Sequence, residues 1–145
     1  MDKVKFYMAG GMAGLSVEEQ MEWRKDIKKR INNSLIHDPT YFFQPPYYYQ
    51  PDGDYHRSER EAFMFDLNRL RHSDIVIVNF NIPKSIGTAM EIAVAHENRI
   101  PVIGLNENKN ELHPWLYECC TRICETREEL VEHIVNFYLN WYNYF

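Results

Sequence analysis

The sequence contains few cysteines and no long apolar segment. Its three cysteines, Cys119, Cys120 and Cys124, lie in the last quarter of the 145 residues, and no His or Cys stands at zinc-site spacing elsewhere. We interpret them as reduced structural thiols, so neither a disulfide framework nor a metal site is expected. The longest apolar runs fall far short of the ~20 residues of a membrane span, and the N-terminus lacks the apolar core of a signal peptide. We therefore expect a cytoplasmic protein without a membrane partner.

Positive charge is also scarce. Lys and Arg number 16 against 21 Asp and Glu, which gives a formal net charge of -5, and no basic run is long enough to follow a nucleic-acid backbone. A polymeric nucleic acid is therefore not an expected partner. The 6 glycines and 7 prolines, beside 45% hydrophobic residues, exclude collagen-like and disordered chains. The length fits one globular domain over residues 1–145.

Apolar runs alternate with helical patterns along the chain. Residues 4–9 are apolar and aromatic and stop at Gly10-Gly11, as a buried strand does before a close turn. A Ser followed by Glu at the third position opens a helix at residue 16 and another at residue 58. We expect strands at residues 4–9, 74–80, 101–105 and 122–125, and helices at residues 16–33, 58–72, 84–99, 113–120 and from 126 into the C-terminal tail.

The segment between the first two helices is harder to assign. Residues 34–37 could form a further strand, whereas residues 41–54 are rich in proline and tyrosine and contain Asp52-Gly53, which argues against regular structure there. We interpret that stretch as a long functional or oligomer-contacting loop. The whole pattern predicts an α/β fold of the flavodoxin or Rossmann type, with a doubly wound parallel sheet of about five strands and helices on both faces.

Three segments should meet beyond the carboxyl ends of the strands, where open parallel sheets bind ligands. They are residues 9–14, residues 66–68 and residues 85–91. Gly10 and Gly11 would allow backbone N–H groups to approach an anion, although a tight turn without a ligand explains them equally well. Ser85 and Gly87 would supply a hydroxyl and free N–H groups at a helix start.

Two carboxylates belong to these segments. Glu91 lies in an apolar stretch of its helix, which favours a buried carboxylate over a surface residue that only responds to the helix dipole. Asp66 lies between Phe65 and Leu67, and a solvated helix-face carboxylate is the alternative interpretation. Two carboxylates in one cavity raise each other's proton affinity, which separates an acid from a nucleophile and suits glycosidic bond cleavage.

These residues stand in motifs that resemble a known family. Residues 6–11 (FYMAGG), 65–76 (FDLNRLRHSDIV) and 85–92 (SIGTAMEI) resemble, in order and separation, motifs of the nucleoside 2-deoxyribosyltransferases and the related 2'-deoxynucleoside 5'-phosphate N-hydrolases. The resemblance implies that Glu91 is the covalent nucleophile on the anomeric carbon, that Asp66 transfers a proton to the base and that Tyr7 orients the glutamate. Neither a cofactor nor a metal ion is expected.

The position six residues before the nucleophile separates two branches of that family. Transferases of free nucleosides typically carry aspartate there, whereas relatives that act on 5'-monophosphates typically carry serine, and this chain has Ser85. A carboxylate would repel a phosphate, while a hydroxyl can donate to it. Ser85, together with the Gly10-Gly11 backbone, is therefore our predicted phosphate cradle.

Other candidate substrate contacts carry weaker signals. Phosphate-binding relatives use a residue from a neighbouring subunit, and the nearest match is His113, which could equally be a surface histidine. Arg57 and Lys84 are further candidates to contact the anion, and solvated surface cations are the alternative interpretation. Four aromatic residues could stack on a base or form oligomer contacts: Phe43, Tyr47, Tyr48 and Tyr49.

The sequence thus predicts an enzyme that cleaves the N-glycosidic bond of (2'-deoxy)nucleoside 5'-monophosphates through a glycosyl-glutamate intermediate. One alternative is a transferase that exchanges bases between free deoxynucleosides, and another is a nucleotide-binding sensor that has lost catalysis. We also expect a homo-oligomer with a shared active site, because the tail exposes much apolar area. Its aromatic residues are Phe137, Tyr138, Trp141, Tyr142, Tyr144 and Phe145.

Overall fold

The computed structural model describes residues 4–34, 40–48 and 58–140, which form one parallel sheet flanked by helices. The strand order is β2-β1-β3-β4-β5, and every neighbouring pair is parallel. The strands are β1 (Val4–Gly10), β2 (Thr40–Phe43), β3 (Ile75–Asn79), β4 (Val102–Leu105) and β5 (Arg122–Cys124). The helices are α1 (Val17–Asn33), α2 (Glu59–Arg71), α3 (Ile86–Glu97), α4 (Pro114–Cys119) and α5 (Arg127–His133), with a short 3₁₀ helix η1 (Pro45–Tyr48) and a π-helical continuation of α5, η2 (Ile134–Leu139).

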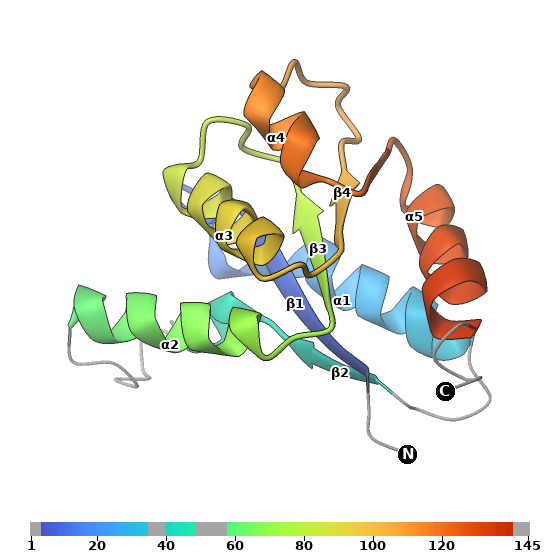
Figure 1. The fold of residues 1–145 in the computed structure, drawn as a ribbon, viewed down its shortest axis with the longest axis horizontal. Coiled ribbons are helices and arrows are strands. Elements are labelled where there is room, and N and C mark those ends of the chain that lie inside the picture. The colour runs from blue at the N-terminus through green and yellow to red at the C-terminus, as the bar shows by residue number, and fades with distance from the viewer. Residues whose placement is uncertain (1–3, 35–39, 49–57, 141–145) are drawn as a thin grey trace.

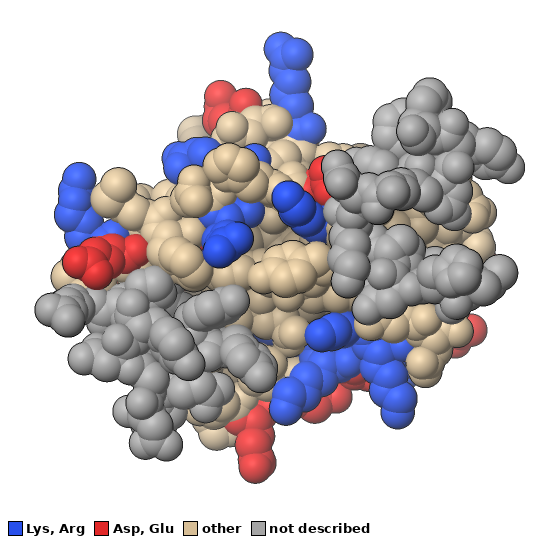
Figure 2. Space-filling model, turned by 90° about the horizontal axis from the view of Figure 1, so that it is seen from below, with Lys and Arg blue, Asp and Glu red and all other residues tan. Residues whose placement is uncertain are grey.

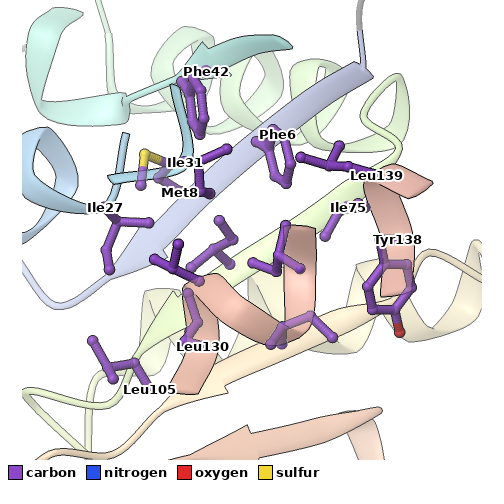
Figure 3. Close-up of a cluster of buried hydrophobic side chains, with 14 of the residues drawn as sticks. Phe6, Met8, Ile27, Ile31, Phe42, Ile75, Leu105, Leu130, Tyr138 and Leu139 are labelled. Atoms are coloured by element: carbon purple, nitrogen blue, oxygen red, sulfur yellow. The ribbon is translucent and has the colours of Figure 1, made fainter. Parts of the chain in front are cut away.

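Helices cover both faces of the sheet (Figure 1), which gives the doubly wound α/β fold expected from the sequence, and a hydrophobic core lies on each side of the sheet. Helices α1 and α5 cover one face, where Phe6, Met8, Ile27 and Leu130 pack together (Figure 3). Helices α2, α3 and α4 cover the other face, against Tyr7 and the remaining alternate residues of the central strands. Burial on both faces is the reason that β3 reads as a continuous apolar run.

The helix starts agree with the capping signals. The hydroxyl of Ser16 accepts from the N–H of Glu19 at 3.1 Å, and the Glu19 carboxylate accepts from the N–H of Ser16 at 3.1 Å. Ser58 and Thr126 cap α2 and α5 in the same way, each by accepting from the N–H three residues on. Such caps satisfy N–H groups that lack a partner in the first turn, so the helix boundaries follow directly from the sequence.

The expectation of a loop over residues 41–54 is wrong at its start. Ser34 is the C-cap of α1 and residues 35–39 lie outside the described residues, while the second strand is Thr40–Phe43, inside the stretch expected to lack regular structure. Tertiary packing decides this, because Phe42 stacks on Phe6 with ring centroids 4.8 Å apart and Phe43 stacks on Tyr7 at 5.2 Å. The two rings fill opposite faces of the sheet, as alternating strand residues do.

The strand order reverses direction between β1 and β3, and this point defines where a ligand site can form. Chain connections from β1 and β3 leave in opposite directions across the sheet, and open α/β sheets bind their ligands at the carboxyl ends of the strands at such a point. The opposite end of the sheet carries Lys and Arg side chains interspersed with Asp and Glu (Figure 2). Within the described residues, no helix is both long and apolar enough to span a bilayer.

Candidate active site

Three elements bring the predicted catalytic residues together at the reversal point. Tyr7 lies on β1, on the sheet face that α2 and α3 cover, and its side chain is fully buried. Asp66 on α2 and Glu91 on α3 are both half-buried, and the two helices pack against each other. The Tyr7 hydroxyl forms a hydrogen bond with the Glu91 carboxyl group, and the charge of the Asp66 carboxylate raises the pKa of Glu91. The structure therefore assembles the predicted catalytic trio in one place, although its residues lie far apart in the sequence.

Glu91 has a strongly perturbed carboxyl group. Its pKa is raised to about 7, and desolvation is the largest cause; the hydrogen bond from Tyr7 lowers the pKa, the negative charge of Asp66 raises it, and the charge of Arg24 lowers it. A carboxyl group at pH 7 is then present in both protonation states, and its ionised form is more basic and more nucleophilic than an ordinary glutamate. Perturbation of this kind inside a crevice is typical of functional sites.

Ser85 is the N-cap of α3, and this cap involves a second hydroxyl. Its Oγ accepts from the N–H of Thr88 at 3.3 Å and from the Thr88 hydroxyl at 2.9 Å. Both interactions use the oxygen as an acceptor, so the Ser85 hydroxyl proton can be donated to another group. Gly87 is exposed, and a Cβ there would have no atom within 4 Å, so packing does not require glycine at this position.

Close packing explains why glycine stands at positions 10 and 11, and the sequence alone did not show this. A Cβ on Gly10 would lie 2.9 Å from Cζ2 of Trp23, and a Cβ on Gly11 would lie 2.6 Å from Ile82. The Gly11 N–H donates to Oδ1 of Asn81 at 3.1 Å, and Nδ2 of Asn81 donates back to the Gly11 carbonyl at 3.2 Å. That N–H is therefore already engaged, and the phosphate cradle predicted for it needs revision toward the start of α3.

A wide groove runs between α3 and α4. It has a volume of about 1100 Å³, and Ser85, Lys84 and His113 are among its lining residues. His113 is exposed and caps α4, since its Nδ1 accepts from the N–H of Trp115 at 3.1 Å. The groove thus brings Ser85 and His113 to one cavity within a single chain, whereas Glu91 is not among its lining residues.

One base-stacking candidate is corrected by the structure. Phe43 is only 2% exposed and packs between Tyr7 and Phe65, with a ring centroid distance of 5.7 Å to Phe65. It supports the tyrosine from within the core and offers no free face to a nucleobase. Tyr49 and Arg57 lie outside the described residues, as do the side chains of Tyr47 and Tyr48.

Arg24 is a polar residue that sequence reasoning missed. Its guanidinium is completely buried against the end of β1 and lies 4.6 Å from the ring centroid of Trp23. A signal was present, because Arg24 stands three residues after Met21 and three before Ile27 on the apolar stripe of α1. The interpretation of that helix rested on its apolar residues alone and passed over the arginine.

Metal ligands and disulfides do not feature in the described part of the chain. In residues 4–34, 40–48 and 58–140, no group of three His, Cys, Asp or Glu side chains is arranged to hold a metal ion. Cys119, Cys120 and Cys124 are free thiols, and burial raises the pKa of Cys120 to about 12. Such a thiol stays protonated at neutral pH and is a poor nucleophile.

Comparisons with known proteins support the fold at low sequence identity. No protein-family model matches the chain, and no curated protein sequence matches it. A conserved protein from Enterococcus faecalis V583 superimposes with a TM-score of 0.77 at 17% identity, covering 92% of this chain and 98% of that one. A 2-deoxyribosyltransferase from Bacillus psychrosaccharolyticus gives 0.70 at 14% identity, covering 88% and 90% of the two chains. The CMP N-glycosidase of Clostridium botulinum gives 0.56 at 18% identity, covering 92% and 98%.

The doubly wound α/β fold predicted from the alternation of strands and helices is therefore confirmed. The chain shares a five-stranded parallel α/β fold with a deoxyribosyltransferase and with an N-glycosidase of a nucleoside monophosphate.

Proposed function

We propose that this protein is an N-glycosidase of nucleoside 5'-monophosphates. The observation that carries the proposal is the desolvated carboxyl group of Glu91, which faces Asp66 and the Tyr7 hydroxyl at the point where the sheet order reverses. The names of two solved structures of the same fold, a 2-deoxyribosyltransferase and a CMP N-glycosidase, agree with chemistry at a nucleoside glycosidic bond.

The first chemical step would join the sugar to the enzyme. The Glu91 carboxylate attacks C1', a C1'–O bond forms, and the C1'–N bond breaks with its electron pair moving to the base. Asp66, in its acid form, donates a proton to the departing base. The Tyr7 hydroxyl donates to Glu91 and holds one carboxylate oxygen, which leaves the other oxygen directed at the sugar.

The second step would release the sugar phosphate. Asp66, now a carboxylate, removes a proton from water as the water oxygen attacks C1', and the ester bond to Glu91 breaks so that its carboxylate is regenerated. The base and the sugar 5'-phosphate are then both free. If a second base reaches the intermediate instead of water, the same residues catalyse transfer, which is our alternative function.

Selectivity for a 5'-phosphate would reside at the start of α3. The Ser85 hydroxyl can donate to a phosphate oxygen while its oxygen still caps the helix, and the N–H groups of the first turn, including that of Gly87, favour an anion. Lys84 and His113 line the adjacent groove and could approach the same anion from its other side.

The deciding experiment is incubation of the pure protein with a panel of ribo- and deoxyribonucleoside 5'-monophosphates, followed by chromatography for free base. We expect release from monophosphates and much slower release from the matching nucleosides. Reaction with nucleosides alone would favour the transferase, and exchange of an added free base into the nucleotide would identify transfer directly. Ligand binding without any turnover, and unchanged in Glu91→Ala, would instead indicate a sensor.

We also propose that the protein works as a homo-oligomer. The helical layer formed by α2, α3 and α4 exposes several large apolar side chains, an arrangement typical of a surface that is covered in the assembled protein. These residues are Phe63, Met64, Ile86, Met90, Trp115 and Tyr117, exposed by 45% to 77%. A second chain on this layer would close the α3–α4 groove and could complete the phosphate site.

A further inference from the structure

Arg24 is a buried cation that contacts no carboxylate in the part of the chain that the structure describes. Its side chain has no exposed surface, and within residues 4–34, 40–48 and 58–140 no ion pair joins its guanidinium to an Asp or Glu within 4.0 Å. An arginine without an anionic partner is unfavourable in a protein interior. Its retention at this place therefore needs an explanation.

The guanidinium connects α1 to the end of β1. Its Nε donates to the Met8 carbonyl at 3.2 Å, its Nη2 donates to the Gly10 carbonyl at 3.4 Å, and its Nη1 donates to the Gln20 carbonyl. Met8 follows directly after Tyr7 in the chain, and Gly10 is the last residue of the same strand. Glycine at position 10 makes the approach possible, since a Cβ there would lie 2.9 Å from the Trp23 ring and 3.4 Å from Nη2.

The positive charge of Arg24 lowers the pKa of Glu91. Burial lowers its pKa to about 10, so that it stays cationic at neutral pH, and the groups whose charges favour the cation are Glu91 first and Tyr7 second. Three described elements present polar groups to Glu91: Tyr7 on β1, Asp66 on α2 and Arg24 on α1. Of these, Arg24 is the one positive charge, and it opposes the effect of Asp66.

We propose that Arg24 is a positioning residue of this site, which fixes the part of β1 that directly follows Tyr7 and supplies the positive charge that favours the carboxylate form of Glu91. The proposal deepens the proposed function, because it assigns how the nucleophile is kept ionised and aligned. It predicts that charge and hydrogen bonding at position 24 act separately. Charge sets the ionisation of Glu91, and the forked hydrogen bonds set the geometry of β1.

The first test follows Glu91 itself and requires no substrate. Side-chain carboxyl carbons are labelled with ¹³C in glutamate, and the Glu91 resonance, assigned by its loss in Glu91→Gln, is titrated by NMR. In Arg24→Met, which retains the length of the side chain, the midpoint should rise by about half a pH unit to one unit. In Arg24→Lys, which retains the charge, it should stay at the wild-type value. An unchanged midpoint in Arg24→Met overturns the proposal.

The second test uses rates, with Lys25→Met as the matched control on the exposed side of the same helix. Arg24→Lys should lower kcat about tenfold while the acid limb of the pH profile stays in place, because an ammonium group cannot hold the Met8 and Gly10 carbonyls as the fork does. Lys25→Met should match the wild type. Full activity of Arg24→Lys refutes the positioning role, and this readout remains if Arg24→Met does not fold. Absence of any glycosidic activity in the wild type would refute the proposed function, while the NMR titration would still test Arg24.

Discussion

Replacement of Glu91, the proposed nucleophile, should make the protein more stable above pH 7. In Glu91→Gln the side chain keeps its shape but can no longer ionise. The Glu91 pKa rises from an ordinary value of 4.5 to about 7 in the folded protein, chiefly through desolvation. Because the folded state binds the proton more tightly than the unfolded state, the wild type loses stability as the pH rises from about 4.5 to about 7, and it stays at the lower level above that.

The size of the effect follows from the same shift. At about 1.4 kcal/mol per pH unit, a change from 4.5 to about 7 amounts to about 3 kcal/mol for the fully ionised group. At pH 5 the folded wild type is almost entirely protonated at Glu91 and resembles the glutamine variant. The stability advantage of Glu91→Gln should therefore grow by about 2–3 kcal/mol between pH 5 and pH 8. The pH-dependent part is independent of how well the amide packs.

Urea denaturation at pH 5, 6, 7 and 8, followed by circular dichroism at one protein concentration, measures this difference. Glu97→Gln is the matched control, because Glu97 is exposed on the same helix α3. Its stability difference from the wild type should change little across the series. If the Glu91→Gln advantage is constant with pH, or shrinks as the pH rises, Glu91 is not a desolvated carboxyl group and the argument for it as an activated nucleophile fails.

Three further predictions address activity and assembly. The value of kcat/KM should rise with pH through about 7 as Glu91 ionises. Tyr7→Phe should move this rise to higher pH and lower kcat about 5–30-fold, because a hydrogen bond to the carboxylate is lost. An unmoved rise in a pH-rate titration would show that Tyr7 does not influence the ionisation of Glu91. Ser85→Asp should reduce turnover of monophosphates by about 10–100-fold, because a carboxylate replaces the hydroxyl that donates to the phosphate. Turnover of nucleosides should change little, because aspartate is also a good helix N-cap. Equal losses for both substrates in parallel kinetic assays would refute phosphate selectivity. Light scattering should detect an oligomer that Met90→Glu dissociates, and a wild-type monomer with full activity would contradict the shared site.

Local chemistry made much of the fold predictable. The capping pairs at Ser16 and Ser58 fix helix starts through hydrogen bonds between neighbours in sequence, and β3 is apolar throughout because both of its faces are covered. The strand at Thr40–Phe43 was misplaced for the opposite reason. Its formation depends on stacking of Phe42 on Phe6 and of Phe43 on Tyr7, and those partners are distant in the chain.

The candidate site was also predictable only in part from the sequence. Motif order and the apolar surroundings of Glu91 selected Tyr7, Asp66 and Glu91 from the sequence alone, since each motif is local. Only the tertiary structure decided that their side chains act on one another, because desolvation and charge coupling depend on what surrounds a group in space. Only the structure assigned the Gly11 N–H to Asn81 and placed the buried Arg24 at the end of β1. A pattern of residue types identifies which groups are available, whereas packing across the sheet determines which of them lose water and meet.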